Sequence, residues 1–142
     1  MLIERKVHNR LIETCIPVPP ETGGIIGGRN NIISIFEFDK LSDNISNNSY
    51  KPNTVYLNEV INLWEKNNIE FYGVFHSHYS GGNVLSVPDK EYILRIMKAV
   101  PLTISKLYFP LIFPKESMLA YIAVRKGNEV HIEKDTVIMV DT

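Results

Sequence analysis

Two histidines separated by a single residue, His76 and His78, are the side chains of this sequence best suited to chemistry. Ser86 follows His78 after seven intervening residues, and Asp89 follows Ser86 after two more. Side chains at positions i and i+2 of an extended strand point the same way, about 7 Å apart at the Cα atoms. Two neutral imidazoles and one carboxylate, with a fourth position left to water, are the ligand set of a catalytic zinc. His76 and His78 can therefore converge on one metal ion, with Asp89 as a third ligand.

Each half of this pattern also has an ordinary structural explanation. Half-exposed strands carry histidines for many reasons, and an H-x-H pair alone is a weak signal. The segment Ser86–Asp89 reads Ser-Val-Pro-Asp before an apolar helix, which fits a helix capping box with proline in the first turn. The two interpretations are compatible, because a cap serine can present its hydroxyl while a nearby aspartate binds metal. Glu21, placed before a glycine-rich segment, is the further residue that favours the chemical interpretation.

The elements that must position these residues follow from apolar periodicity and from the glycines and prolines. Helices are expected over about 5–14, around the apolar stripe 57–64, and from Ser86 to the residue before Pro101. Strands are expected over 21–28, 32–38, 69–77, 104–113, 118–126 and 129–140, with turns at 29–31 and 127–128 and loops at 39–53 and 79–85. The histidines end the strand 69–77. The predicted class is α+β, a curved, mainly antiparallel sheet with helices packed on it.

Composition excludes several classes of function. The 15 basic and 16 acidic side chains give a formal net charge of −1 without long blocks of either sign, which argues against a broad surface for nucleic acid or anionic membrane. Cys15 is the single cysteine, so a metal must be held by nitrogen and oxygen ligands. No uninterrupted apolar run reaches membrane-spanning length. We expect one domain over 1–142 and a cytoplasmic location.

The chain resembles the JAB/MPN metalloprotease family through the JAMM motif, which combines a glutamate before a glycine-rich strand with an H-x-H pair, a serine and an aspartate. The matching residues are Glu21, Gly23, Gly24, Gly27, Gly28, His76, His78, Ser86 and Asp89. The spacing from His78 to Asp89 is the family's own, and the resemblance covers most of the chain. It implies a cytidine-deaminase-like MPN domain of the compact prokaryotic type. Tyr79 departs from the pattern, because the family commonly has proline there.

The resemblance also implies a role for each matching polar residue. His76, His78 and Asp89 become the ligands of a zinc ion. Glu21 becomes the general base that acts on the zinc-bound water, and Ser86 becomes a hydrogen-bond donor to the scissile carbonyl oxygen. The implied reaction is hydrolysis of the amide bond after the C-terminal glycine of a ubiquitin-like or sulfur-carrier protein. The sequence contains no ubiquitin-like segment and no terminal Gly-Gly, so we expect that protein to be a separate partner.

Other functions stay open at this point. The family includes non-catalytic interaction modules in which the metal motif has decayed, although an intact motif favours an enzyme. A zinc peptidase acting on small peptides is a second alternative. Hydrolysis of a nucleobase amine is a third, but the sequence lacks the H-x-E and P-C-x-x-C signature of the deaminases. Cys15 has no adjacent histidine or lysine and is expected to be a buried apolar residue, while His8 and His131 are expected to be solvated.

Overall fold

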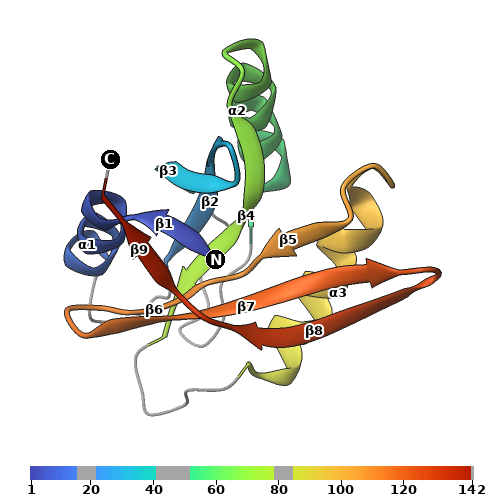
Figure 1. The fold of residues 1–142 in the computed structure, drawn as a ribbon. Coiled ribbons are helices and arrows are strands. Elements are labelled where there is room, and N and C mark those ends of the chain that lie inside the picture. Colours follow the sequence, from blue (N-terminus) through green and yellow to red (C-terminus); the bar gives the residue numbers. More distant parts are fainter. Residues whose placement is uncertain (16–21, 41–51, 79–84, 142) are drawn as a thin grey trace.

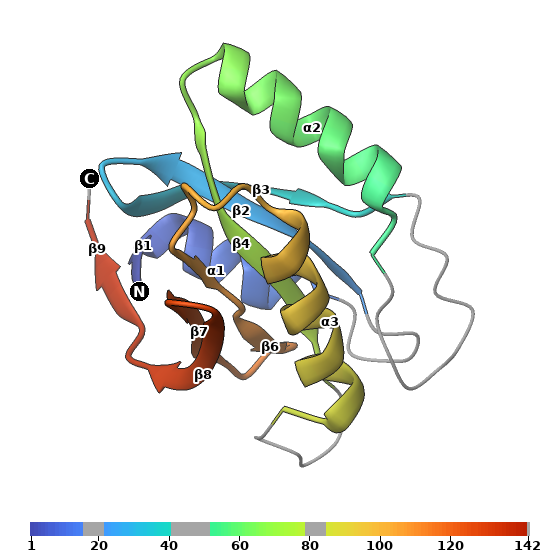
Figure 2. The ribbon, with the colours of Figure 1, turned by 90° about the vertical axis from the view of Figure 1, so that its right-hand side faces the viewer.

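One mixed sheet, with one helix on one face and two on the other, organises the chain (Figures 1 and 2). The computed structural model describes residues 1–15, 22–40, 52–78 and 85–141. Glu21, Tyr79 and most of the two expected loops lie outside the described residues. The α+β class expected from the sequence is confirmed.

The helices form where the apolar periodicity predicts them. They are α1 (Arg5–Thr14), α2 (Thr54–Lys66) and α3 (Val87–Ala99). The side chain of Asn53 caps α2 by accepting a hydrogen bond of 3.0 Å from the Tyr56 N–H, which satisfies one of the free amides of the first turn. Ser86 caps α3 in the same way, and Pro101 follows its end as predicted. None of the described helices has the length and apolar composition that crossing a membrane requires.

The sheet joins distant parts of the chain. Its strands are β1 (Leu2–Glu4), β2 (Gly23–Arg29), β3 (Ile32–Phe38), β4 (Glu70–Ser77), β5 (Lys106–Tyr108), β6 (Leu111–Phe113), β7 (Ser117–Lys126), β8 (Glu129–Asp135) and β9 (Ile138–Val140). Neighbouring strands follow the order β5-β7-β6-β4-β2-β3-β1-β9, and β8 pairs with β7. The longer ladders, β2 with β3 and β4 and β7 with β8, are antiparallel as expected.

The expected single strand 104–113 is wrong, because it is divided into β5 and β6. Pro110 has no N–H group to contribute to a ladder, and the Phe109 N–H turns to the Tyr121 carbonyl at 2.7 Å. Both pieces run parallel to β4 and antiparallel to β7. The interruption therefore places β6 beside the C-terminal end of β4, where the histidines lie.

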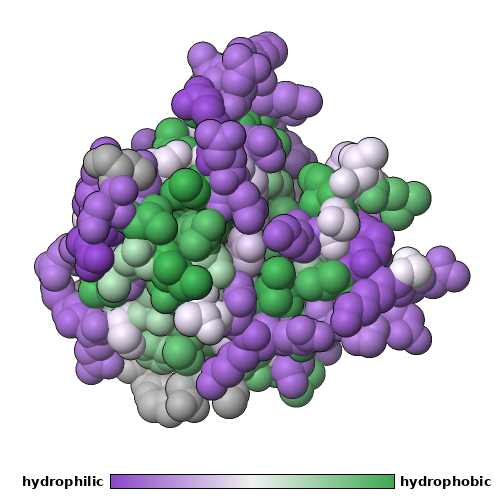
Figure 3. All heavy atoms as spheres, in the orientation of Figure 1, coloured by the Kyte–Doolittle hydropathy of each residue, from purple (hydrophilic) through white to green (hydrophobic). Residues whose placement is uncertain are grey.

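The expected strand 129–140 is also divided. Its first part, β8, forms the predicted hairpin with β7 through Gly127, whose φ of 62° suits glycine. Its last part, β9, leaves β7 and pairs in parallel with β1, a strand that the sequence analysis did not predict. Figure 3 shows apolar side chains gathered on this side of the molecule, where Ile138 and Met139 of β9 are exposed.

Two hydrophobic cores cover the two faces of the central strands. Ile26 of β2 and Phe75 of β4 join the core beneath α1. Ile25 and Val74, the residues just before them, join the core beneath α2 and α3. Neighbouring residues of one strand thus face opposite ways. The result is a rigid pair of strands, buried on both faces, at the centre of the sheet.

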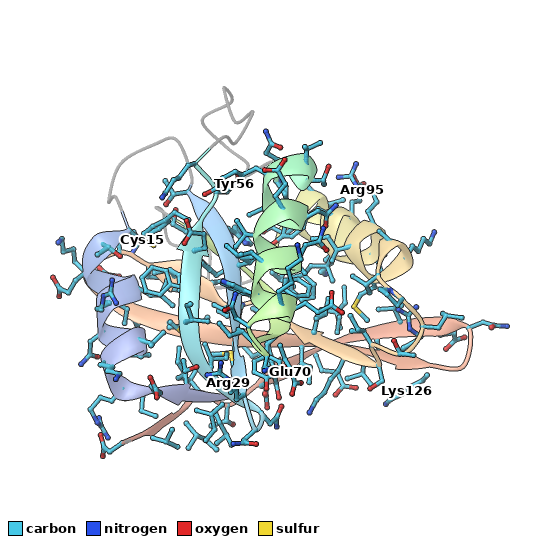
Figure 4. All side chains as sticks on the ribbon, turned by 90° about the horizontal axis from the view of Figure 1, so that it is seen from above. Cys15, Arg29, Tyr56, Glu70, Arg95 and Lys126 are labelled. Carbon is cyan, nitrogen blue, oxygen red and sulfur yellow. The ribbon has the colours of Figure 1, made fainter. Side chains whose placement is uncertain are left out.

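The glycines of β2 allow its neighbours to come close, as the sequence predicts. A Cβ atom on Gly24 would collide with the Glu37 carbonyl oxygen of β3 and lie 2.9 Å from the ring of Phe75. In Figure 4, Arg29 and Glu70 lie near one another at one end of the sheet, and Cys15 and Tyr56 lie toward the other end. β4 begins at the first end and carries its histidines to the second.

Candidate metal centre

Three side chains from β4 and α3 converge at the end of β4. His76 is the next-to-last residue of β4, and His78 directly follows the strand. Asp89 lies in the first turn of α3. The Nε2 atoms of His76 and His78 are 3.1 Å apart. Asp89 Oδ1 is 3.1 Å from His76 Nε2, and Asp89 Oδ2 is 3.1 Å from His78 Nε2. The predicted convergence of these three residues is confirmed.

The backbone hydrogen bonds explain why both imidazoles point the same way. The N–H groups of His76 and His78 donate to the carbonyls of Pro110 and Ile112, at 3.2 and 2.9 Å. The N–H of Ser77 instead donates across the opposite side of the strand to Thr22, at 2.8 Å. Alternating N–H directions are typical of an extended strand, in which side chains two residues apart also lie on the same face. The segment 110–112 therefore holds the backbone of both histidines in register.

The Ser77 side chain points away from the two imidazoles, as predicted. Its Oγ atom accepts a 2.9 Å hydrogen bond from the Thr22 N–H, and the residue is fully buried. Two hydrogen bonds thus join Thr22, the residue before β2, to Ser77, the residue between the histidines. Thr22 directly follows Glu21 in the sequence, although Glu21 itself lies outside the described residues.

The capping box and the candidate metal ligand occur together at the start of α3. Ser86 Oγ accepts a hydrogen bond from the Asp89 N–H at 3.2 Å, and Asp89 Oδ2 accepts one from the Ser86 N–H at 3.0 Å. The same carboxylate contacts both histidines. The capping box is therefore present, and its aspartate also belongs to the group that could hold a metal ion. The cap also orients Asp89, because it fixes one carboxylate oxygen and leaves Oδ1 facing His76.

Burial and hydrogen bonding shift the pKa values of Asp89 and His76 in the directions that favour metal binding. His76 is completely buried and Asp89 is 3% exposed. Burial raises the pKa of Asp89, but the hydrogen bonds from the two imidazoles outweigh it and hold that pKa well below its usual range. Burial lowers the pKa of His76 despite the opposing influence of Asp89. An ionised carboxylate and a neutral imidazole are the forms that bind metal.

The spacing of the donor atoms fits a small ion. Ligand atoms 2.0–2.1 Å from a tetrahedral zinc are about 3.3 Å from one another. Here the two Nε2 atoms are 3.1 Å apart, and each lies 3.1 Å from a different oxygen of Asp89. His76, His78 and Asp89 can therefore hold a metal ion. The donor types leave its identity open, because two histidines and one carboxylate also bind iron(II) in some oxygenases.

Tyr92 contacts the other side of the His76 ring, a contact that the sequence analysis missed. Its hydroxyl lies 2.7 Å from His76 Nδ1, and the two rings meet edge to face with their centres 5.4 Å apart. Tyr92 lies on the buried face of α3, where it is 5% exposed. Its position three residues after Asp89, on the same side of the helix, is the sequence signal that could have revealed the contact.

The remaining candidates lie outside the cluster. Cys15 is buried, and burial raises the pKa of its thiol to about 11 against a weaker lowering by a hydrogen bond to Thr22. The thiol is therefore protonated at neutral pH, and the expected buried apolar role is confirmed. His8 contacts Asn9 on the surface of α1, and His131 contacts Glu129 in the exposed hairpin.

Comparison with known proteins adds the fold alone. No family model and no curated protein matches this chain. The solution structure of a protein from Desulfitobacterium hafniense has a TM-score of 0.68 and 16% identity, covering 100% of this chain and 94% of its own. The solution structure of a protein from Salinibacter ruber has a TM-score of 0.54 and 12% identity, and the match covers 99% of this chain and 92% of that protein. The fold and the site together define an α+β protein with a His-His-Asp group that could hold a metal.

Proposed function

We propose that this chain is a zinc-dependent amide hydrolase of the JAB/MPN type, with that family's cytidine-deaminase-like fold. Its substrate would be the bond after the C-terminal glycine of a ubiquitin-like or sulfur-carrier protein. The observation that carries the proposal is the meeting of His76, His78 and Asp89 within 3.1 Å contacts at the end of β4. Neither the fold comparison nor composition identifies the substrate, which comes from the motif's resemblance to the family.

The three clustered side chains would hold the zinc. When bound, zinc acts as a Lewis acid and lowers the pKa of a coordinated water to about 7. His76 and Asp89 are excluded from solvent, whereas His78 is only partly buried. Among the three side chains, that of His78 is therefore the most accessible to solvent, at 12% exposed.

Ser86 would position the substrate carbonyl. Its oxygen already accepts a hydrogen bond from the Asp89 N–H. A hydroxyl is both donor and acceptor, so its own proton remains available for a second partner. The residue is exposed at the N-terminus of α3. Donation from Ser86 to the carbonyl oxygen would stabilise the negative charge that develops there during hydrolysis.

Glu21 would be the general base. A carboxylate can remove a proton from the attacking water and later deliver it to the leaving amine. The support comes from the next residue, because Thr22 is bonded to Ser77 through both its N–H and its carbonyl. The chain therefore passes beside the histidine strand immediately after Glu21. The assignment requires β2 and β4 to be neighbours in the sheet, and they are.

Incubation with fusion proteins tests the proposed function. Candidate ubiquitin-like and sulfur-carrier proteins, each extended by a short peptide after the terminal glycine, are mixed with the zinc-loaded protein and weighed by intact mass spectrometry. We expect cleavage after the glycine, loss of cleavage with a chelator, and recovery on adding zinc.

Two results would contradict this proposal. Intact fusions in the presence of one bound zinc per chain would favour a non-catalytic interaction module. Equal cleavage of unstructured peptides that lack a ubiquitin-like domain would favour a small-peptide peptidase.

Variants of Ser86 separate its two roles. Replacing this cap residue by alanine is expected to cost about 1 kcal/mol of stability, and by glycine only a few tenths. Both changes remove the hydroxyl, so both are expected to reduce turnover by about 100- to 1000-fold. Thermal unfolding and kcat on a cleaved fusion measure the two effects. Wild-type turnover in Ser86→Gly would show that the hydroxyl serves the helix and not the substrate.

A further inference from the structure

Both ring nitrogens of His76 face side chains of the same helix. Asp89 Oδ1 lies 3.1 Å from Nε2, and the Tyr92 hydroxyl lies 2.7 Å from Nδ1. The two residues are three positions apart in α3, which lies in front of β4 in Figure 2. The imidazole therefore lies between two side chains of the same helix and has no exposure to solvent.

The chemistry of imidazole fixes what Tyr92 must do when a metal is bound. A neutral imidazole carries one N–H and one lone pair. If Nε2, the atom within the three-donor cluster, uses its lone pair for the metal, the proton must reside on Nδ1. Nδ1–H then donates to the Tyr92 oxygen at the observed 2.7 Å. Partners of this kind orient the ring of a metal-binding histidine and raise its basicity.

The same hydroxyl also suits the metal-free cluster. His76 Nε2 lies 3.1 Å from Asp89 Oδ1, a distance at which Nε2–H can donate a hydrogen bond to the carboxylate. The lone pair then lies on Nδ1, and the Tyr92 O–H can rotate to donate to it. A carboxylate or a backbone carbonyl in this position could only accept. A tyrosine supports both tautomers and so keeps a buried nitrogen paired in each state.

We propose that Tyr92 is the positioning residue of the metal centre, which holds the His76 ring and reverses the direction of its hydrogen bond when metal binds. The inference rests on the metal site of the proposed function but not on the reaction. Tyr92 also packs edge to face on Phe109, with ring centres 6.2 Å apart. Phenylalanine at position 92 would preserve that packing and remove the hydroxyl alone.

Zinc affinity of Tyr92→Phe tests the role. Competition with a chromogenic chelator is expected to show 10- to 100-fold weaker zinc binding than in the wild type, and the absorption spectrum of the cobalt-substituted protein is expected to change. Tyr72→Phe is the matched control, because the Tyr72 hydroxyl accepts a 2.9 Å hydrogen bond from the Asn31 N–H at the other end of β4. Its zinc affinity and cobalt spectrum should remain those of the wild type.

Nitrogen-15 NMR of the wild-type protein gives a second test that needs no variant. His76 is expected to carry its proton on Nδ1 with zinc bound and on Nε2 without it. Unchanged affinity and cobalt spectrum in Tyr92→Phe, or a proton that stays on one nitrogen in both states, would overturn the inference. If the wild type binds zinc but cleaves no fusion, the proposed function fails while these measurements still decide the role of Tyr92. A wild type that binds neither zinc nor cobalt would overturn both.

Discussion

Replacing His78 with alanine is expected to remove stoichiometric zinc from the protein. The change deletes one of the three side chains that could hold the metal ion. We therefore expect a larger loss of zinc affinity than the 10- to 100-fold typical of a residue that only hydrogen-bonds to a ligand. His78 is the best ligand to remove, because His76 is completely buried and Asp89 also caps α3. Metal analysis by mass spectrometry after gel filtration should find about one zinc per wild-type chain and none in the variant.

His131→Ala is the control for this experiment. His131 is also a histidine of the sheet, but it lies in the exposed hairpin, where its imidazole contacts the carboxylate of Glu129 at 3.0 Å. Its loss should leave the zinc content unchanged. Retention of one zinc per chain in His78→Ala, with an affinity within a few-fold of the wild type, would show that the cluster is not the metal site.

Replacing Glu21 with glutamine is expected to lower turnover by about 100- to 10,000-fold while zinc remains bound. Glutamine has nearly the same shape but cannot accept a proton at neutral pH, and general acid–base catalysis contributes a factor of this size. Zinc retention is expected because His76, His78 and Asp89 already form a group among the described residues that could hold a metal ion. The measurements are kcat on a cleaved fusion and the zinc content of the same preparation.

Glu129→Gln is the control, because it makes the same change of charge at an exposed residue distant in sequence from the motif. This variant should have wild-type turnover. Two outcomes contradict the assignment of Glu21 in different ways. Full activity in Glu21→Gln would mean that another group is the base. Loss of zinc would mean that Glu21 acts on the metal site itself.

The local features of the site were accessible from the sequence because they depend on short spacings. Residues i and i+2 of a strand share a face, which placed His76 and His78 together. The Ser-x-x-Asp spacing predicted both the cap of α3 and the position of Asp89. The helix bounds followed from apolar periodicity over three turns, with prolines and asparagines at the ends. The structure agrees with all of these.

Only the tertiary structure decided the features that depend on distant contacts. β5, β6 and β9 have three residues each, too few to show a period, and their pairing with β4 or β1 depends on partners far away in the chain. The hydrogen bond of Tyr92 to His76 likewise joins two separate elements, α3 and β4. The sequence by itself determined which side chains could bind a metal, since that depends on local geometry. The packing of α3 on the sheet decided which side chains contact the His76 ring, because those contacts depend on how α3 lies against the end of β4.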